Sequence, residues 1–324
     1  MSPRIGKTFV LGAGLGVRLR PLTDALPKPL FPVFGKPIIT FALEHLREAG
    51  VSAVAINTHH LAHHFDRLFP DRSHAGLSVR FFHEPVLLET GGGMKNVEAW
   101  VGDEPFLTCS GDLVCDLDIP SLTESHFEDA NDATLALRRT GLSTSVAYDP
   151  ESRRVVDIAG VLGASAPGNY DFAGISVWNP TVFGRIQAGL RRSMGSVLTD
   201  WLRAGARIGG VVLDGNRWFN IGSRKEYFTI HDVVRREAWS PSYLAGEALP
   251  WTCNLHRSAM VAPGAVIAGC SWIGAGCLVE SNVTLENSFL WPGSRVRPNT
   301  KLIDCVVAGA EIGPGAFRDK DFLP

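Results

Sequence analysis

The chain has 324 residues, of which 45% are hydrophobic and 20% are charged, a composition typical of a globular protein. This length exceeds what one hydrophobic core usually serves, so we expect two domains. The formal net charge of −2 gives no general attraction to nucleic acid or to an acidic membrane. Neither is therefore an expected partner, and any polyanion must be bound by a local cluster of cations.

The cysteines and the N-terminus predict the compartment. The six cysteines include no CxxC pair, and several lie in apolar runs, which favours buried free thiols in a reducing environment. The first apolar run, 9–11, is followed at once by glycine, and no apolar run is long enough for a secretory leader or a membrane span. We therefore expect a cytoplasmic protein.

The first predicted strand, 9–11, leads into a glycine-rich loop. Three glycines and then three cations follow it, namely Gly12, Gly14, Gly16, Arg18, Arg20 and Lys28. Glycine permits positive φ and lets backbone N–H groups approach phosphate oxygens, while the cations supply the charge that a polyphosphate needs. The loop therefore predicts a phosphate-binding site.

Beyond the loop, apolar strands alternate with amphipathic helices up to about residue 220. This alternation predicts an α/β fold with a largely parallel sheet. The expected strands are 51–56, 77–82, 106–110, 133–137, 145–148, 172–178 and 207–213. The expected helices are 37–49, 61–69, 89–100, one beginning at each of Pro180 and Ser196, and 224–238. The turn-rich segment 149–168 gives no assignment.

Two further motifs follow strands in this first part of the chain. A second glycine cluster stands at 91–93, and the pair Gly111-Asp112 ends the strand 106–110. Open α/β sheets bind ligands at the carboxyl ends of their strands. We therefore expect both glycine clusters and the Asp112 carboxylate to face one crevice.

The C-terminal part has a different period. Residues 239–252, with two prolines and mixed polarity, are a predicted linker between domains at 1–238 and 253–324. Apolar residues then recur every six positions, with one slip of a single residue, at Leu255, Val261, Ile267, Ile273, Val279, Leu285, Leu290, Val296 and Leu302. This hexapeptide pattern predicts a parallel β-helix of about three coils. We expect it to serve a structural role and to form the contact of a homo-oligomer.

The opening loop does not fit the two common phosphate-binding fingerprints. A dinucleotide loop needs glycine where Val17 stands, and no Lys-Ser or Lys-Thr follows the glycines as in a P-loop. The residues present are G-x-G-x-R-L-x-P-L-T-x-x-x-P-K-P-L, with the Gly-Asp pair further on. This long motif resembles that of the sugar-1-phosphate nucleotidyltransferases, and the resemblance spans residues 7 to about 235.

The resemblance implies a fold and a reaction. The fold would be a Rossmann-like mixed-sheet nucleotidyltransferase domain, here followed by a short left-handed parallel β-helix. The substrates would be a nucleoside triphosphate (NTP) and a sugar 1-phosphate, and Mg²⁺ the cofactor. Arg18 would bind the triphosphate and its leaving pyrophosphate, and Lys28 the α-phosphate and the sugar phosphate. For Arg20 a surface role is equally expected.

The implied metal site departs from the family pattern. Asp112 is the expected Mg²⁺ ligand, since magnesium prefers carboxylate oxygens together with phosphate and water. The second carboxylate of the family stands in a W-x-D-x-G segment, and the matching residue here is Asn220 in the segment 218–222. An amide oxygen can bind the metal but adds no charge, so we expect weaker Mg²⁺ binding.

The resemblance also implies contacts for the base and the sugar. The nucleotide-binding residues would be Leu11, Gly12, Ala13, Gly14, Gly16, Glu84, Gly91 and Gly92, and the sugar-phosphate side would hold Gly174 and Asn220. A carboxylate such as Glu84 can accept from the N–H groups of guanine or from N3–H of uracil, which favours GTP or UTP over ATP. A surface carboxylate is the alternative for Glu84.

The sequence gives conflicting indications of which sugar 1-phosphate is the substrate. The segments 56–59, 88–93 and 172–177 look most like N-acetylmuramate-1-phosphate uridylyltransferases, whereas the β-helix resembles that of mannose-1-phosphate guanylyltransferases. The lysine that binds the sugar phosphate in many members has no counterpart in 149–178. Together with Asn220, its absence leaves a second interpretation, a catalytically weak regulatory or nucleotide-sugar-sensing subunit.

Overall fold

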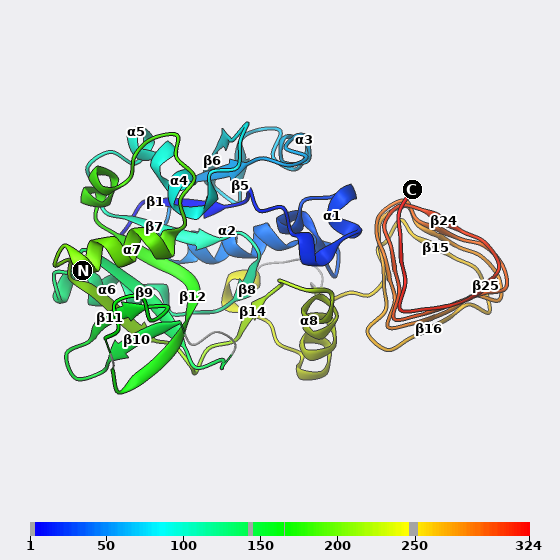
Figure 1. Ribbon diagram of the computed structural model, residues 1–324. Coiled ribbons are helices and arrows are strands. Elements are labelled where there is room, and N and C mark those ends of the chain that lie inside the picture. The colour runs from blue at the N-terminus through cyan, green and yellow to red at the C-terminus, as the bar shows by residue number, and fades with distance from the viewer. Residues whose placement is uncertain (1–3, 142–144, 165, 246–251) are drawn as a thin grey trace. The chain divides into compact units, whose positions relative to one another are not determined.

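The computed structural model describes residues 4–141, 145–164, 166–245 and 252–324, and its contacts divide the chain into two compact units (Figure 1). The first unit comprises Met1–Gly14 and Ile39–Trp218, and the second comprises Leu15–Ile38 and Phe219–Pro324. The loop with the predicted phosphate-binding cations therefore belongs to the same unit as the C-terminal repeats. The predicted linker 239–252 falls within the second unit, and its residues 246–251 lie outside the described part of the chain.

The first unit is built on a mixed ten-stranded sheet in the order β10-β11-β13-β9-β12-β7-β1-β4-β6-β5. Its strands are β1 (Lys7–Leu11), β4 (Ala53–Thr58), β5 (Ser73–His74), β6 (Leu77–His83), β7 (Phe106–Ser110), β9 (Ala133–Arg138), β10 (Val146–Asp149), β11 (Arg154–Ile158), β12 (Gly168–Trp178) and β13 (Ile208–Val212). β1 pairs in parallel with β4 and β7, whereas β12 runs antiparallel between β7 and β9. The carboxyl ends of β1, β4, β7 and β9 therefore share one edge of the sheet.

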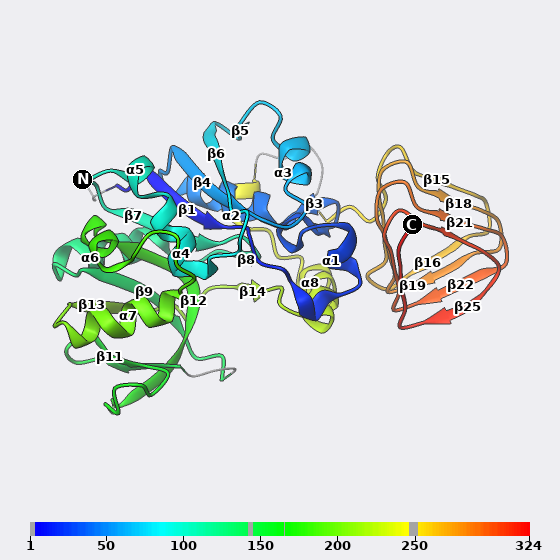
Figure 2. The same ribbon diagram turned by 45° about the horizontal axis from the view of Figure 1, so that its top comes forward.

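Helices pack on this sheet, as Figure 2 shows for α4 and α7. They are α2 (Ile38–Glu48), α3 (His63–Leu68), α4 (Glu89–Asn96), α5 (Glu98–Val101), α6 (Ile119–Glu128), the 3₁₀ helix η3 (Pro180–Arg185) and α7 (Met194–Arg203). The side chains of Asp118 and Ser193 cap α6 and α7 by accepting the amides of Ser121 and Ser196. Because Ser193 is the cap, α7 begins two residues before the position predicted from Ser196.

Most predicted elements of this unit are confirmed, with several differences; the predicted helix 89–100, for example, is divided into α4 and α5. The strand β7 has the predicted bounds 106–110. The segment without an assignment contains β11, which pairs antiparallel with β10. The residues from Pro180 form a 3₁₀ helix, and β12 begins at Gly168, four residues before the predicted start. Both the added strand and the longer β12 belong to pairings with β10, which local periodicity does not reveal.

The second unit begins with the cation loop and continues through one helix. Its elements before the repeats are η1 (Val17–Leu19), α1 (Leu22–Ala25), η2 (Lys28–Leu30), β2 (Pro32–Val33), β3 (Lys36–Pro37), α8 (Arg224–Glu237) and η4 (Ser242–Leu244). The short strand β8 (Leu113–Cys115) belongs to the first unit, and β14 (Trp218–Asn220) lies where the chain passes from the first unit to the second in sequence. The helix α8 has the predicted bounds to within one residue.

The repeats form three parallel four-stranded sheets, the architecture expected for a left-handed β-helix (Figure 1). The strands are β15 (Met260–Val261), β16 (Val266–Ala268), β17 (Trp272–Ile273), β18 (Leu278–Val279), β19 (Thr284–Glu286), β20 (Phe289–Leu290), β21 (Arg295–Val296), β22 (Thr300–Ile303), β23 (Val306–Val307), β24 (Glu311–Ile312), β25 (Gly315–Arg318) and β26 (Asp321–Phe322). The prediction of about three coils is wrong, because each sheet has four strands.

The fourth coil consists of β24, β25 and β26, which lie beyond Leu302, the last apolar position of the predicted series. The coils also shorten along the chain. Val261 pairs with Val279, a coil of 18 residues, whereas Leu302 pairs with Phe317, a coil of 15 residues. Most of the predicted apolar positions form the core, where Ile273, Val279, Leu285, Leu290, Val296 and Leu302 are fully buried. Leu255 is the exception at 38% exposed, since it makes only one isolated bridge.

The cysteine prediction is largely confirmed. All six cysteines are free thiols and five are buried, whereas Cys253 is exposed. Burial raises the pKa of the Cys109 thiol well above its usual range and that of Cys115 to about 12, so both are neutral at pH 7.

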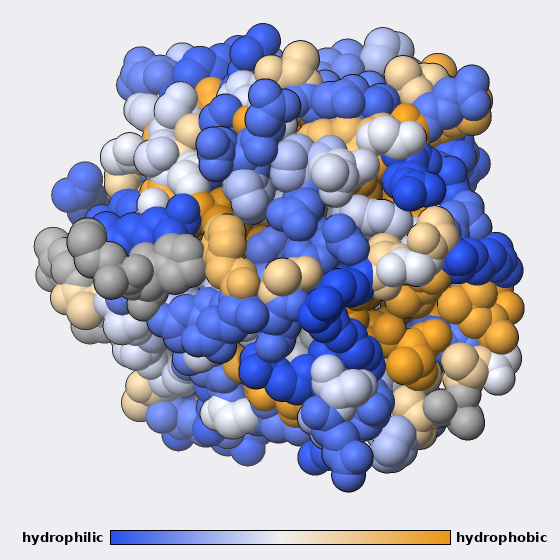
Figure 3. Space-filling model, turned by 90° about the vertical axis from the view of Figure 1, so that its left-hand side faces the viewer, coloured by the Kyte–Doolittle hydropathy of each residue, from blue (hydrophilic) through white to orange (hydrophobic). Residues whose placement is uncertain are grey.

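Hydrophilic residues cover most of the face drawn in Figure 3. Within the described residues no helix has the length and apolar character to cross a membrane.

Histidine 231 of α8 gives the second unit a pH-dependent stability. Its ring is fully buried, Nδ1 donates to the Tyr227 carbonyl at 2.8 Å, and Nε2 accepts from the Phe34 amide at 3.4 Å. Burial lowers the pKa of His231 to about 4, whereas an unfolded histidine has a pKa near 6.5. The unfolded state therefore binds the proton first, and stability is lost as pH falls from about 6.5 to about 4.

We expect His231→Gln to remove on the order of 3 kcal/mol of this pH dependence. The measurement is the free energy of chemical unfolding of both proteins at several pH values between 4 and 7. Wild type should lose more stability than His231→Gln over that interval. Parallel pH profiles for the two proteins would show that His231 is not the titrating group.

Candidate active site

The first glycine loop leaves β1 at the shared edge of the sheet. The amide of Gly12 donates to Oδ1 of Asn57 at 2.8 Å, and a Cβ on Gly12 would lie 2.7 Å from the Asn57 carbonyl oxygen. Glycine at this position therefore permits the close approach of β1 and β4. Ala13 is buried, whereas Gly14 is exposed with no atom near the place of a Cβ. The backbone at Gly14 is thus open to a ligand.

Glu84 holds this loop from inside the fold. Its side chain is fully buried, which excludes the surface alternative. Oε1 accepts from Nδ2 of Asn57 at 2.8 Å and Oε2 accepts from the Leu88 amide at 2.9 Å. The chain of hydrogen bonds from Gly12 through Asn57 and Glu84 to Leu88 therefore ties the glycine loop to the start of α4.

The second glycine cluster, in α4, packs against another part of the same unit. The amides of Gly91 and Gly92 both donate to the Arg192 carbonyl, at 2.8 and 3.0 Å. A Cβ on Gly92 would clash with the Leu190 carbonyl oxygen, and one on Gly93 would lie 2.6 Å from Glu84 Oε1. Close packing against the segment 190–193 and against Glu84 therefore explains why glycines stand here.

Asp112 follows β7 at the same edge as the first glycine loop. The Gly111 amide donates to the Leu11 carbonyl at 3.0 Å, and a Cβ on Gly111 would lie 2.7 Å from that oxygen. Gly111 thus brings the half-buried Asp112 next to the end of β1. Gly174, with φ of 86°, lies where the register of β12 shifts, and a Cβ there would meet Leu113 Cδ1 at 2.7 Å. This bulge makes room for the turn that carries Asp112.

The cations lie in the second unit against two glycines. Gly16 has φ of 59°, and a Cβ there would meet Thr23 Cγ2 at 2.8 Å and Lys28 Cβ at 3.3 Å. A Cβ on Gly222 would lie 2.7 Å from Nη2 of Arg18, whose side chain is exposed. Gly16 therefore makes room for Lys28, and Gly222 makes room for Arg18.

Asn220 ends β14 two residues before Gly222. Its Oδ1 is buried and has no hydrogen-bond partner among the residues that the structure describes. A buried carbonyl oxygen without a donor is a costly arrangement that a bound cation would relieve. Magnesium accepts an amide oxygen beside carboxylate, phosphate and water oxygens, so the side chain of Asn220 suits this ion.

The predicted site residues divide between the units. Leu11, Gly12, Ala13, Gly14, Glu84, Gly91, Gly92, Asp112 and Gly174 lie in the first unit, and Gly16, Arg18, Lys28 and Asn220 lie in the second. Within the first unit the structure brings Asp112 to the end of β1, and within the second it brings Arg18 to Gly222. Asn57 was missed by the sequence analysis, although an asparagine directly after the apolar residues of a predicted strand was a usable signal. In the described part of the chain no group of three or more His, Cys, Asp or Glu side chains could hold a metal ion.

The chain is similar to known proteins in sequence and in fold. Residues 7–237 match the family described as nucleotidyl transferase. A mannose-1-phosphate guanylyltransferase of Mycobacterium tuberculosis is 31% identical over 295 residues, covering 89% of this chain and 80% of its own. An N-acetylmuramate alpha-1-phosphate uridylyltransferase of Neisseria meningitidis is 31% identical over 223 residues, which are 67% of this chain and 93% of its own. The crystal structure of HddC from Yersinia pseudotuberculosis shares the fold, with a TM-score of 0.57 at 20% identity over 69% of this chain and 97% of that one.

Proposed function

We propose, because the chain belongs to the nucleotidyl transferase family, that it joins a sugar 1-phosphate to the nucleoside monophosphate part of an NTP and releases pyrophosphate. Its relatives that transfer guanylyl and uridylyl groups favour GTP or UTP as the nucleotide. The observation that carries the proposal is the complete cation loop, in which Lys28 packs on Gly16 and Arg18 on Gly222. At both glycines the absence of a Cβ leaves room for a cationic side chain, and two cations in one loop suit a triphosphate.

The reaction is an in-line displacement at the α-phosphorus. An oxygen of the sugar phosphate forms a bond to this phosphorus while the bond to the pyrophosphate oxygen breaks, so negative charge moves to the leaving group. Lys28 neutralises the α-phosphate and the incoming sugar phosphate, and Arg18 neutralises the departing pyrophosphate. Positioning and charge neutralisation are the main contributions that a protein can make to such a step.

Asp112 and Asn220 are the residues that would hold Mg²⁺. The orphan Oδ1 of Asn220 supports this assignment. A bound magnesium ion supplies positive charge to phosphate oxygens. Because Asn220 is neutral, Asp112 balances only one of the two positive charges of Mg²⁺. The phosphates of the nucleotide must therefore balance the other.

Replacing Asn220 with aspartate is expected to lower the Mg²⁺ concentration for half-maximal rate by about tenfold, because ligand charge raises metal affinity. The measurement is the initial rate of pyrophosphate release against Mg²⁺ concentration at saturating substrates. Asn216→Asp adds the same charge nearby in sequence and should leave the titration unchanged. An unchanged titration for Asn220→Asp as well would remove Asn220 from the metal site.

The nucleotide base is assigned to the surface made by Leu11, Gly12, Ala13 and Gly14. The open backbone at Gly14 supports this placement. Glu84 acts here through Asn57, which orients the Gly12 amide, and Gly91 and Gly92 act by packing α4 on the segment 190–193. The sugar phosphate is assigned to the side of Gly174, next to the turn of Asp112.

A screen of pyrophosphate release tests the function. Four NTPs are assayed against mannose, glucose and N-acetylmuramate 1-phosphates with Mg²⁺. We expect turnover with GTP or UTP and one of these sugars. Tight binding of a nucleotide sugar without turnover of any pair would instead identify a regulatory subunit and overturn the proposal.

A further inference from the structure

One face of the β-helix is covered by the rest of its unit. On a β-helix strand the neighbours of an inward residue point outward, and Leu290 of β20 points inward, fully buried. Its neighbours Phe289 and Trp291 point outward, yet they are 0% and 4% exposed. Trp272 of the next strand in the same sheet is 2% exposed and lies 3.0 Å from the Cβ position of Gly35. Segments outside the β-helix therefore cover this sheet.

The covering segments include the turn that carries Lys28. The ring of Phe31 is fully buried, with its centroid 4.8 Å from that of Trp291 and 5.6 Å from that of Tyr227, both edge to face. The amide of Phe31 donates to the Lys28 carbonyl at 3.0 Å and so closes the η2 turn. Whatever fixes the Phe31 ring therefore also fixes the backbone of Lys28.

A buried chain of hydrogen bonds runs from the β-helix to this loop. Nε1 of Trp291 donates to the Tyr227 hydroxyl at 3.1 Å, and that hydroxyl donates to the Pro32 carbonyl at 2.5 Å. Tyr227 is fully buried, and burial raises its pKa, so the hydroxyl keeps its proton at any working pH. Hydrogen bonds in such a dry site are strong and specific in geometry.

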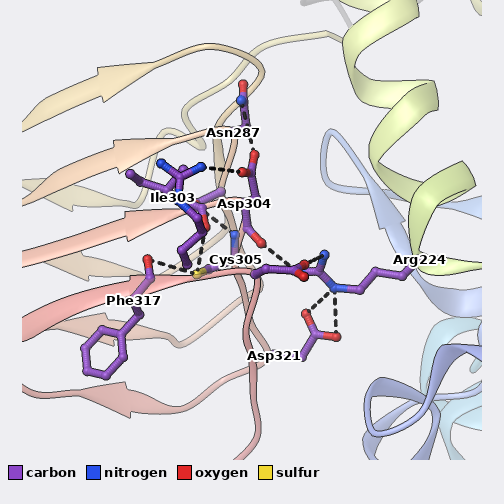
Figure 4. Close-up of polar contacts among 10 residues, drawn as sticks. Arg224, Asn287, Ile303, Asp304, Cys305, Phe317 and Asp321 are labelled. Atoms are coloured by element: carbon purple, nitrogen blue, oxygen red, sulfur yellow. Dashed lines mark hydrogen bonds and ion pairs between the residues drawn. The ribbon is translucent and has the colours of Figure 1, made fainter.

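The helix α8 that carries Tyr227 is itself fastened to the β-helix, as Figure 4 shows. Arg224 donates from Nε to both oxygens of Asp321, at 2.9 and 3.1 Å, and from Nη2 to the Asp304 carbonyl at 2.6 Å. The Asp304 carboxylate in turn accepts from Asn287 at 3.3 Å. Since the Asp321 side chain is only 8% exposed, this ion pair is largely shielded from solvent.

The start of α8 also reaches the second cation. The Gly222 amide donates to Oε2 of Glu226 at 3.0 Å, and Gly222 is the residue against which Arg18 lies. One helix, held on one side by the β-helix, therefore contacts the supports of both cations.

We propose that the β-helix serves catalysis directly, as the support that positions Lys28, with Tyr227 and Trp291 as the positioning residues. This proposal rests on the proposed function in assigning Lys28 to the phosphates. The repeats would then help to position a residue that acts on the substrate phosphates, in addition to any role in assembly. Loss of either hydrogen bond should loosen the turn while the β-helix itself stays folded.

The test compares Tyr227→Phe and Trp291→Phe, which keep an aromatic ring but remove a hydrogen-bond donor, with Leu285→Ala in the β-helix core. Leu285 is fully buried in β19, which belongs to a different sheet, so its loss destabilises the β-helix without touching the loop. The two readouts are hydrogen exchange of the peptide spanning 26–38 and the separate values of kcat and KM for pyrophosphate release in the forward reaction. A melting curve for each variant shows that it is folded.

We expect Tyr227→Phe to speed exchange in 26–38 by about tenfold and to lower kcat at least fivefold with the KM for the NTP within about twofold of wild type, and we expect a smaller effect for Trp291→Phe. Leu285→Ala should lower the melting temperature more and change neither readout. Unchanged exchange in Tyr227→Phe, or equal effects of Leu285→Ala, would overturn the support of the loop. Faster exchange with unchanged kinetics would overturn its catalytic role. A wild type inactive on every substrate pair would refute the proposed function, while the exchange measurement would still test the positioning.

Discussion

Replacing Lys28 with alanine is expected to lower kcat/KM for the NTP by about 10²- to 10³-fold, the usual effect of removing one preorganised charge from a developing anion. The η2 turn and the packing of Lys28 Cβ near Gly16 hold the side chain in place before substrate binds. Lys28 acts on the negatively charged oxygens of the α-phosphate group as it is transferred, so the loss should fall mainly on kcat. The measurement is the rate of pyrophosphate release at saturating Mg²⁺.

Arg20→Ala is the matched control for Lys28→Ala. Arg20 lies in the same loop, but its side chain is 61% exposed and pairs with Asp24 at 3.3 Å on the surface. Removing it should change kcat/KM by less than about twofold, since exposed ion pairs contribute little. Full activity in Lys28→Ala, or equal losses in both variants, would show that Lys28 does not act on the reacting phosphates.

The family could be predicted from the sequence, whereas the contacts around the candidate site residues could not. Lys28, Arg18 and Asp112 stand in motifs whose residue types follow from phosphate chemistry, so a linear pattern can identify them. Glu84 could be read as a base contact or a surface carboxylate. In the structure Glu84 is buried and bonded to Asn57 and to the Leu88 amide. The order of residues in the sequence does not show which residues will lie together in the fold.

Glycines show the same limit. The second cluster was read as a place where a base could approach. In the structure Gly91 and Gly92 meet the Arg192 carbonyl, about 100 positions along the chain. A glycine indicates that something comes close to the backbone, but the sequence alone does not say whether that is a ligand or another segment of the protein.

The β-helix illustrates what periodicity can and cannot give. The six-residue period identified the fold and most of its core, because inward positions recur regularly. The outward aromatic residues Phe289 and Trp291 carried no periodic signal, yet they contact α8 and the loop of Lys28. Finding the contacts between the repeats and the loop of Lys28 therefore required the tertiary structure.

Asn57→Asp is expected to destabilise the first unit by about 3–5 kcal/mol at pH 7. The amide Nδ2 of Asn57 donates to Glu84 Oε1 at 2.8 Å, and both side chains are buried. An aspartate would place two carboxylates at that distance, and they cannot both ionise. One of them must bind a proton in the folded state, which at pH 7 is unfavourable.

The pH dependence of this variant distinguishes charge repulsion from a simple packing defect. The shared proton gives the folded variant a carboxyl pKa above the unfolded value near 4. Its penalty is therefore largest at neutral pH and shrinks as pH falls towards 4, where the unfolded state binds the proton too. The difference in unfolding free energy from wild type should accordingly narrow between pH 7 and pH 4.

The measurement is chemical unfolding of wild type and Asn57→Asp at both pH values. Asn169→Asp makes the same change at an exposed site on β12 and should stay within about 0.5 kcal/mol of wild type. A penalty for Asn57→Asp that is the same at both pH values would mean that Glu84 and residue 57 are not in contact. In that case the Asn57–Glu84 hydrogen bond would not be what orients the Gly12 amide, and another group would have to hold the glycine loop.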